Sequence, residues 1–128
     1  MANFKIITNN PMAALEYPNL CDFFNKSVEG IFISCRDTVH KGAVLINHPL
    51  SGSVKPNVSP YKSLVVSDEH HVVDFRSLQL IEDAIATIKK LGIRNNMQYN
   101  EAVLEDFQVI DLDLLKSAIE SLPPNYYK

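Results

Sequence analysis

Side chains suited to ligand chemistry gather in one stretch of the sequence, residues 48–62. The groups in question are, in chain order, His48, Ser51, Gly52, Ser53 and Lys55. Backbone N–H groups at a glycine, together with hydroxyls and an ammonium, suit a small anion. The combination predicts an anion-binding loop, although the same serines also occur in ordinary turns.

The stretch is expected to be stiff. Pro49, Pro56 and Pro60 each fix φ and push the preceding residue toward extended geometry. A connection of this length without helical or strand periodicity is uncommon in a compact domain, and is usually functional or disordered. The prolines favour an ordered functional loop.

Two apolar runs flank this loop, residues 43–47 and 63–67, and a similar run occupies residues 4–8. Continuous rather than alternating apolar residues are typical of strands that are covered on both faces, as in parallel sheets. These three runs are therefore predicted to be strands of one sheet. A weaker pattern predicts a further short strand over residues 26–28.

Polar residues follow the carboxyl end of each of the three main predicted strands. They are Asn9 and Asn10, the loop from His48 to Lys55, and Ser67 with Asp68. If the strands are parallel, these residues meet at the edge of the sheet where α/β proteins bind ligands. The alternatives are that Asn9 and Asn10 only form a turn before Pro11, and that His48 has a structural role.

The clearest helical pattern covers residues 75–91. Leu78, Ile81, Ile85 and Ile88 recur at intervals of three and four, and Asp74 precedes them as an N-cap. Further helices are predicted over residues 12–17, 30–41, 100–104, and from Asp111 or Asp113 to Leu122, with a last strand over residues 107–110. The predicted core contains Ile6, Leu45, Val65, Leu78, Ile81, Ile85 and Leu115.

Strands that alternate with helices predict an α/β fold, with a mostly parallel sheet flanked by helices on both faces. The 128 residues, 46% of them hydrophobic and 21% charged, are typical of one globular domain that spans residues 1–128. No signal peptide and no apolar run of membrane-spanning length is present, so we expect a cytoplasmic protein without a membrane partner.

The charge and the cysteine content exclude further classes of function. The net charge is −3, and only residues 30–67 are net positive, with four basic residues against one acidic residue. This is far from the dense basic stripe of nucleic-acid-binding proteins, so we expect no nucleic-acid partner. Cys21 and Cys35 lack the spacing of a redox pair or a zinc site, and are expected to be reduced thiols.

The known cofactor and catalytic fingerprints are absent from the sequence. No Walker A, G-x-G-x-x-G or G-x-S-x-G pattern occurs, and the adjacent pair His70 and His71 lacks a third metal ligand. We therefore expect no metal and no cofactor. No catalytic residue is predicted, and the predicted ligand-binding residues are Asn9, Asn10, His48, Ser51, Gly52, Ser53 and Lys55.

Three motifs together resemble those of the GrdX family. They are Lys5-Ile6-Ile7-Thr8-Asn9-Asn10-Pro11, then Arg36-Asp37-x-x-His40-Lys41-Gly42, then His48-Pro49-Leu50-Ser51-Gly52-Ser53-Val54-Lys55-Pro56-Asn57 through Pro60-Tyr61-Lys62-Ser63. The resemblance extends to about residue 90. It implies a cytoplasmic accessory of the glycine, sarcosine or betaine reductase system of amino-acid-fermenting bacteria, a family without assigned catalytic residues.

Two classes of function are consistent with these observations. The first is an accessory protein, without its own activity, that binds a reductase subunit or a small anionic metabolite through the loop. The second is a small enzyme in which His48 is the acid–base group while Ser53 and Lys55 hold a phosphate or an oxyanion. The absence of paired carboxylates, a metal set or a nucleophile–base pair favours the first.

Overall fold

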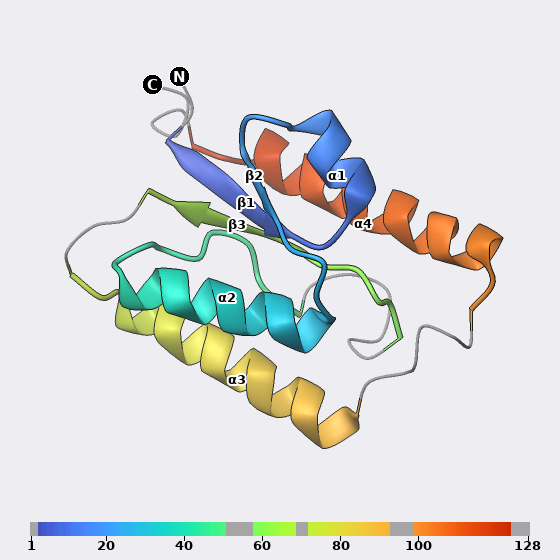
Figure 1. Cartoon of the computed structure of the whole chain (residues 1–128). Helices are drawn as coiled ribbons and strands as arrows, with labels where there is room; N and C mark the ends of the chain where they lie inside the picture. The colour runs from blue at the N-terminus through green and yellow to red at the C-terminus, as the bar shows by residue number, and fades with distance from the viewer. Residues whose placement is uncertain (1–2, 51–57, 69–71, 93–98, 124–128) are drawn as a thin grey trace.

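The computed structural model describes residues 3–50, 58–68, 72–92 and 99–123 (Figure 1). In these residues the chain forms three strands and four helices. In chain order they are β1 (Phe4–Thr8), α1 (Pro11–Glu16), β2 (Cys21–Phe23), α2 (Val28–His40), β3 (Ser63–Ser67), α3 (Phe75–Leu91) and α4 (Glu101–Glu120). None of these helices is long and apolar enough to cross a lipid bilayer.

The three strands form one mixed sheet in the order β2-β1-β3. β1 is parallel to β2 but antiparallel to β3, with Phe4 opposite Ser67 and Thr8 opposite Ser63. The prediction of a mostly parallel sheet is therefore wrong. β3 is buried along its whole length because helices cover it, and burial on both faces does not depend on strand direction.

Residues 43–47 were predicted to be a full strand but form only an isolated antiparallel bridge, Leu45 to Val66. Two backbone hydrogen bonds hold this segment to β3, from Ile46 N to Val65 O at 2.8 Å and from Ser67 N to Val44 O at 2.9 Å. The Leu45 N–H faces the other way and donates to Ser77 Oγ of α3 at 2.8 Å. The segment is thus a short extension of the sheet next to β3.

Helices cover both faces of the sheet, and each face has its own apolar cluster (Figure 1). Ile7 of β1 belongs to the cluster with α2 and α3, while Phe4 and Ile6 belong to the cluster with α1 and α4. This division follows from the two-residue period of a strand. Of the predicted core, Ile6, Leu45, Val65, Ile81, Ile85 and Leu115 are buried, and Leu78 is partly buried.

The prediction of α3 is confirmed, because its local signals agree with each other. Asp74 caps the helix by accepting from Ser77 N at 3.0 Å, and Gly92 follows its last residue with a positive φ of 75°.

The prediction of a strand over residues 26–28 is wrong. Ser27 is instead the N-cap of α2, with its side chain accepting from Gly30 N at 3.1 Å, and Val28 is the first helical residue.

The C-terminal third contains one helix where the sequence predicted a helix, a strand and a second helix. The N-cap at Asn100 is confirmed, and its side chain accepts from Val103 N at 2.9 Å. From there α4 continues without a break, so the strand predicted over residues 107–110 is wrong. Asp111 is no N-cap but lies buried in the middle of α4, facing the sheet.

Candidate functional site

The loop between residues 48 and 62 is described at both ends, up to Leu50 and from Val58 onward. Its central residues lie outside the described part of the chain. Four of the predicted ligand-binding residues are among these, Ser51, Gly52, Ser53 and Lys55. The predicted anion contact of these four residues therefore stays a prediction, while both ends of the loop lie within the described residues.

The first end of the loop is held by the side chain of Asn47. Its Nδ2 donates to Ser63 O at 3.2 Å, and its Oδ1 accepts from Val65 N at 2.8 Å. The amide thus satisfies the backbone of β3 at the point where the bridged segment ends. His48, the next residue, is exposed, and its Nδ1 accepts from the Leu50 N–H at 3.1 Å.

The second end of the loop is held by Asn9, which directly follows β1. Asn9 Oδ1 accepts from Lys62 N at 2.8 Å, and Asn9 Nδ2 donates to Pro60 O and to Lys26 O, each at 2.8 Å. The side chain is buried and its amide makes all of these contacts within the protein. Asn9 is thus an internal support of the loop.

Helix α4 and Tyr99, which precedes its N-cap, also hold this second end. Tyr99 Oη donates to Val58 O at 2.8 Å, and Gln108 Nε2 donates to Tyr61 Oη at 2.8 Å. Between them the Ser59 hydroxyl accepts from Tyr61 N at 3.2 Å and closes a local turn. Three successive anchors therefore fix residues 58–62.

A buried polar cluster lies beneath this end of the loop, where β1 ends and β3 begins. We call it the Asp111 network, and it consists of Thr8, Asn10, Ser63 and Asp111. Asp111 Oδ2 accepts from Ser63 Oγ at 2.6 Å and from Asn10 Nδ2 at 3.0 Å. All four side chains are less than 9% exposed, so the cluster is closed to solvent.

The protons of the Asp111 network have a consistent direction. Because Ser63 donates its proton to Asp111, the hydrogen bond of 2.7 Å between Thr8 Oγ1 and Ser63 Oγ must be donated by Thr8. Thr8 Oγ1 in turn accepts from Asn10 N at 2.9 Å. Every described buried polar side-chain atom has a partner, as expected for groups that have lost their contact with water.

Charge in the network is governed by desolvation. Burial raises the pKa of Asp111, and the hydrogen bonds from Ser63 and Asn10 and the charge of Lys62 oppose this rise. Burial lowers the pKa of Lys62, and the negative charge of Asp111 opposes this change. The fold thus places the side chains of Asp111 and Lys62 in a poorly hydrated setting at the base of the loop. The attraction between their charges only partly offsets the cost of removing them from water.

The strand arrangement places the predicted site residues Asn9 and Asn10 differently from the prediction. Asn9 and Asn10 lie beside the start of β3, while Ser67 and Asp68 lie at the opposite end of the sheet. The expected meeting of these two pairs is therefore wrong, because β3 is antiparallel to β1. Asn10 is fully buried, and its amide is bonded to Met12 N, Gln108 O and Asp111.

Thr8, Ser63 and Asp111 were not predicted from the sequence to be members of a site. For Asp111 a signal exists: Leu122, Ile119 and Leu115 step back by three and four residues, and the next step reaches Asp111. A carboxylate that continues an apolar stripe is predicted to be buried and hydrogen-bonded.

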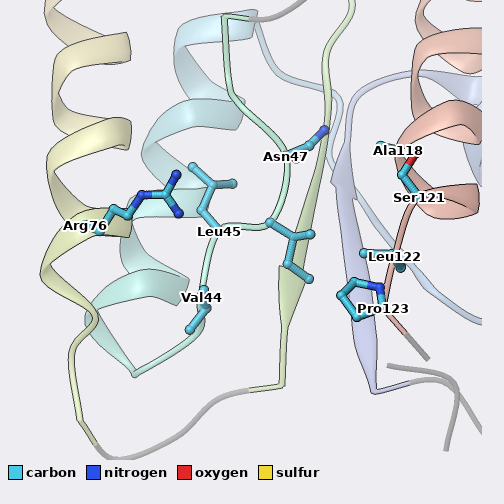
Figure 2. A pocket seen from close by; sticks show the side chains of 9 residues that line it. Val44, Leu45, Asn47, Arg76, Ala118, Ser121, Leu122 and Pro123 are labelled. Carbon is cyan, nitrogen blue, oxygen red and sulfur yellow. The ribbon is translucent and has the colours of Figure 1, made fainter. Parts of the chain in front are cut away.

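A pocket of about 440 Å³ begins where the loop begins (Figure 2). It lies between residues 44–47 and the C-terminal end of α4, and Ala118, Ser121 and Leu122 form its far wall. Its walls are largely apolar, and Arg76 of α3 is its charged residue. Figure 2 shows the Arg76 guanidinium extending from α3 toward Leu45.

Metal-binding and thiol chemistry have little support in the residues described. No three of the described His, Cys, Asp and Glu residues are grouped as metal ligands. Cys21 and Cys35 are free thiols, and burial raises their pKa values to about 11 and about 12, with the charge of Asp22 adding to the rise at Cys21. Both thiols are therefore protonated and weakly nucleophilic at neutral pH.

These observations define a small α/β protein with a mixed three-stranded sheet, whose long loop is anchored at both ends. The chain belongs to the GrdX-like protein family, whose sequence model matches residues 5–120. The matched range extends from β1 to the end of α4, and so includes the loop, both anchoring asparagines and the Asp111 network. No curated protein and no solved structure matches the chain.

Proposed function

We propose that the protein is an accessory of a glycine, sarcosine or betaine reductase system. In this proposal it acts in the cytoplasm and binds a reductase subunit or a small anionic ligand through the loop of residues 48–62. Family membership supports the first part, because the family name refers to that system. The anchoring of the loop supports the second.

The observation that carries the binding role is the double anchor formed by Asn47 and Asn9. Asn47, the residue before the loop, is tied by its amide oxygen and nitrogen to the backbone of β3. Asn9 uses its amide oxygen and nitrogen to hold the backbone of Lys62 and Pro60 at the other end of the loop. Chain ends that are fixed in this way reduce the entropy that the loop loses on binding. A few charge-assisted hydrogen bonds from Lys55 and its neighbours then suffice for measurable affinity.

The hydrogen bond of His48 favours binding over acid–base catalysis. Because Nδ1 accepts from the Leu50 N–H, the neutral imidazole carries its proton on Nε2. That nitrogen is then a hydrogen-bond donor, which suits contact with an anion. A general base would need the unprotonated nitrogen to face the substrate.

A thermal-shift experiment tests the small-ligand form of the proposal. Phosphate, sulfate, acetyl phosphate and small carboxylates would be compared at constant ionic strength on the wild type, on Lys55→Ala and on the control variant Lys41→Ala. Lys41 is an exposed lysine of the same net-positive third of the chain. A ligand at about 100 times its Kd stabilises by roughly 2.7 kcal/mol, which raises Tm on the order of 5 °C.

We expect at least one anion to shift the wild type and Lys41→Ala alike, and Lys55→Ala much less. Sulfate and phosphate stabilise proteins generally through exclusion from the surface, so only the difference between variants counts. Equal shifts in all three proteins would reject the small-ligand form. The subunit form would then be tested by titrating purified reductase subunits against wild type and Lys55→Ala in sedimentation experiments, where absence of any complex would reject it.

A further inference from the structure

A groove between α1 and α4 is lined by apolar side chains that are partly buried or exposed. It has a volume of about 400 Å³, and α1 contributes Met12 and Leu15 while α4 contributes Leu104. Leu15 is 82% exposed, the highest value among the large hydrophobic residues that the structure describes. Single exposed apolar residues are normal, but Leu15 stands at the margin of a concave apolar surface.

The α4 margin of this groove is acidic. Glu101 and Glu105 both line it, one helical turn apart, and neither forms an ion pair with another described residue. Two like charges at positions i and i+4 destabilise a helix by a few tenths of a kcal/mol. The positive end of the helix dipole stabilises the charge of Glu101 in the first turn, but Glu105 lies beyond that turn.

We propose that the α1–α4 groove is a docking site for a basic amphipathic helix of a partner protein. Apolar residues of such a helix would cover Leu15 and Leu104, and its flanking lysines or arginines would pair with Glu101 and Glu105. Helices commonly bind other proteins by laying one apolar face into a groove, and opposite charges at the rim select the partner. A small ligand within the groove would leave Leu15 exposed at its margin, whereas a helix that crosses α1 would bury it.

The floor of the groove connects the docking site to the loop. Tyr61 and Gln108 both line the groove, and the hydrogen bond between them is one of the anchors of residues 58–62. A docked helix would therefore contact the side chains that hold the loop. Of the described loop residues only Tyr61 lines the groove, and the proposal does not depend on what the loop binds.

The test uses a fluorescent synthetic peptide of about 18 residues, composed of leucine and lysine in an amphipathic helical pattern. Its control is the same peptide with glutamate in place of lysine. Binding to the full-length protein would be followed by fluorescence anisotropy, and the binding surface would be mapped by chemical-shift changes of backbone amides.

Three variants decide the result. Glu101→Lys/Glu105→Lys reverses the rim, Leu15→Asn removes the exposed apolar contact, and Asp106→Lys/Asp113→Lys makes the same charge change on the exposed outer face of α4. We expect the basic peptide to bind the wild type and the outer-face variant alike. The rim reversal should weaken binding about tenfold, and Leu15→Asn should weaken it several-fold.

Chemical-shift changes should centre on Leu15, Leu104 and Gln108, and added salt should weaken binding. The proposal is overturned if the basic peptide does not bind the wild type, if the acidic peptide binds equally well, or if the rim and outer-face variants weaken binding to the same extent. Shift changes confined to another surface would also overturn it. The anion experiment on Lys55→Ala is unaffected by any of these outcomes.

Discussion

The two faces of the sheet are built on different principles. On the face covered by α2 and α3, the sheet residues Ile7, Leu64 and Val66 belong to a large apolar cluster, and no described charged side chain is buried there. On the face covered by α1 and α4, apolar packing continues only to the level of Leu115, and at the loop end of the sheet the Asp111 network replaces it. We infer that the α2–α3 face contributes mainly to stability. On the α1–α4 face, part of the buried volume is polar and positions the loop.

The largest expected effect is a loss of stability from the α2–α3 face. Ile81 is fully buried on α3, so Ile81→Ala removes apolar contacts and leaves a cavity. We expect the free energy of unfolding to fall by about 3 kcal/mol, measured by urea denaturation. If this face contributes only stability, an anion that shifts the wild type should produce the same shift in Ile81→Ala.

A smaller loss of stability with a larger effect on the loop is expected from the other face. Asp111→Ala leaves the Ser63 hydroxyl without its acceptor and the Asn10 amide nitrogen with Gln108 O alone, which should cost about 2 kcal/mol. Asp111→Asn keeps an acceptor oxygen and should cost less. Amide hydrogen exchange should accelerate at Tyr61 and Lys62 in Asp111→Ala but not in Ile81→Ala under native conditions.

Similar exchange at residues 58–62 in both variants would remove the distinction between the two faces. It would show that the α4 face supports the loop only through global stability. The Asp111→Asn variant is the control for side-chain volume in this comparison.

The pH dependence of stability isolates the buried carboxylate. The pKa of Asp111 is raised in the folded protein, so the ionised form disfavours folding, and stability is regained as pH falls through the folded pKa. The free energy of unfolding of the wild type minus that of Asp111→Asn should therefore increase as the pH falls from 7 to 4. Every other carboxylate is common to both proteins and cancels in this difference.

A difference that decreases with falling pH would mean that the interactions that lower the pKa, chiefly the hydrogen bonds from Ser63 and Asn10, outweigh desolvation, and a constant difference would mean that the two balance. Denaturant midpoints at several pH values, with unchanged m-values, provide the measurement.

The smallest effect concerns the thiols, one on each side of the sheet. Cys35 is buried and Cys21 is half-buried, and their pKa values are raised to about 12 and about 11. Both should react with a thiol reagent at pH 7 much more slowly than free cysteine, with Cys35 the slower. Cys21→Ser/Cys35→Ser should leave the anion-induced Tm shift unchanged, and rapid labelling of Cys35 in the folded protein would contradict this assignment.

The sequence is sufficient to predict elements whose local signals agree. In α3, the cap at Asp74, the 3-4-3 stripe and Gly92 all point to one helix, and the helix has the predicted bounds. In α4 they conflict, because Phe107, Val109 and Ile110 favour a strand. Packing against the sheet overrides that preference.

The site was predictable only where it depends on a single strand end. Asn9 and Asn10 were identified because they directly follow β1, although the structure gives them internal contacts. Ser63 and Asp111 meet only because β3 is antiparallel to β1 and because α4 is continuous. Neither fact is encoded within a short window of sequence, so periodicity and turn signals could not reveal the network.

The hydrogen bond between Leu45 and Ser77 also bears on aggregation. An open sheet edge offers unpaired N–H and C=O groups to strands of other molecules. Here the outward N–H of Leu45 is occupied by the Ser77 hydroxyl, which itself donates to Asp74, the N-cap of α3. The start of a helix thus shields the edge of the sheet from a second chain, and a change that frays the first turn of α3 would expose that edge to intermolecular β-pairing.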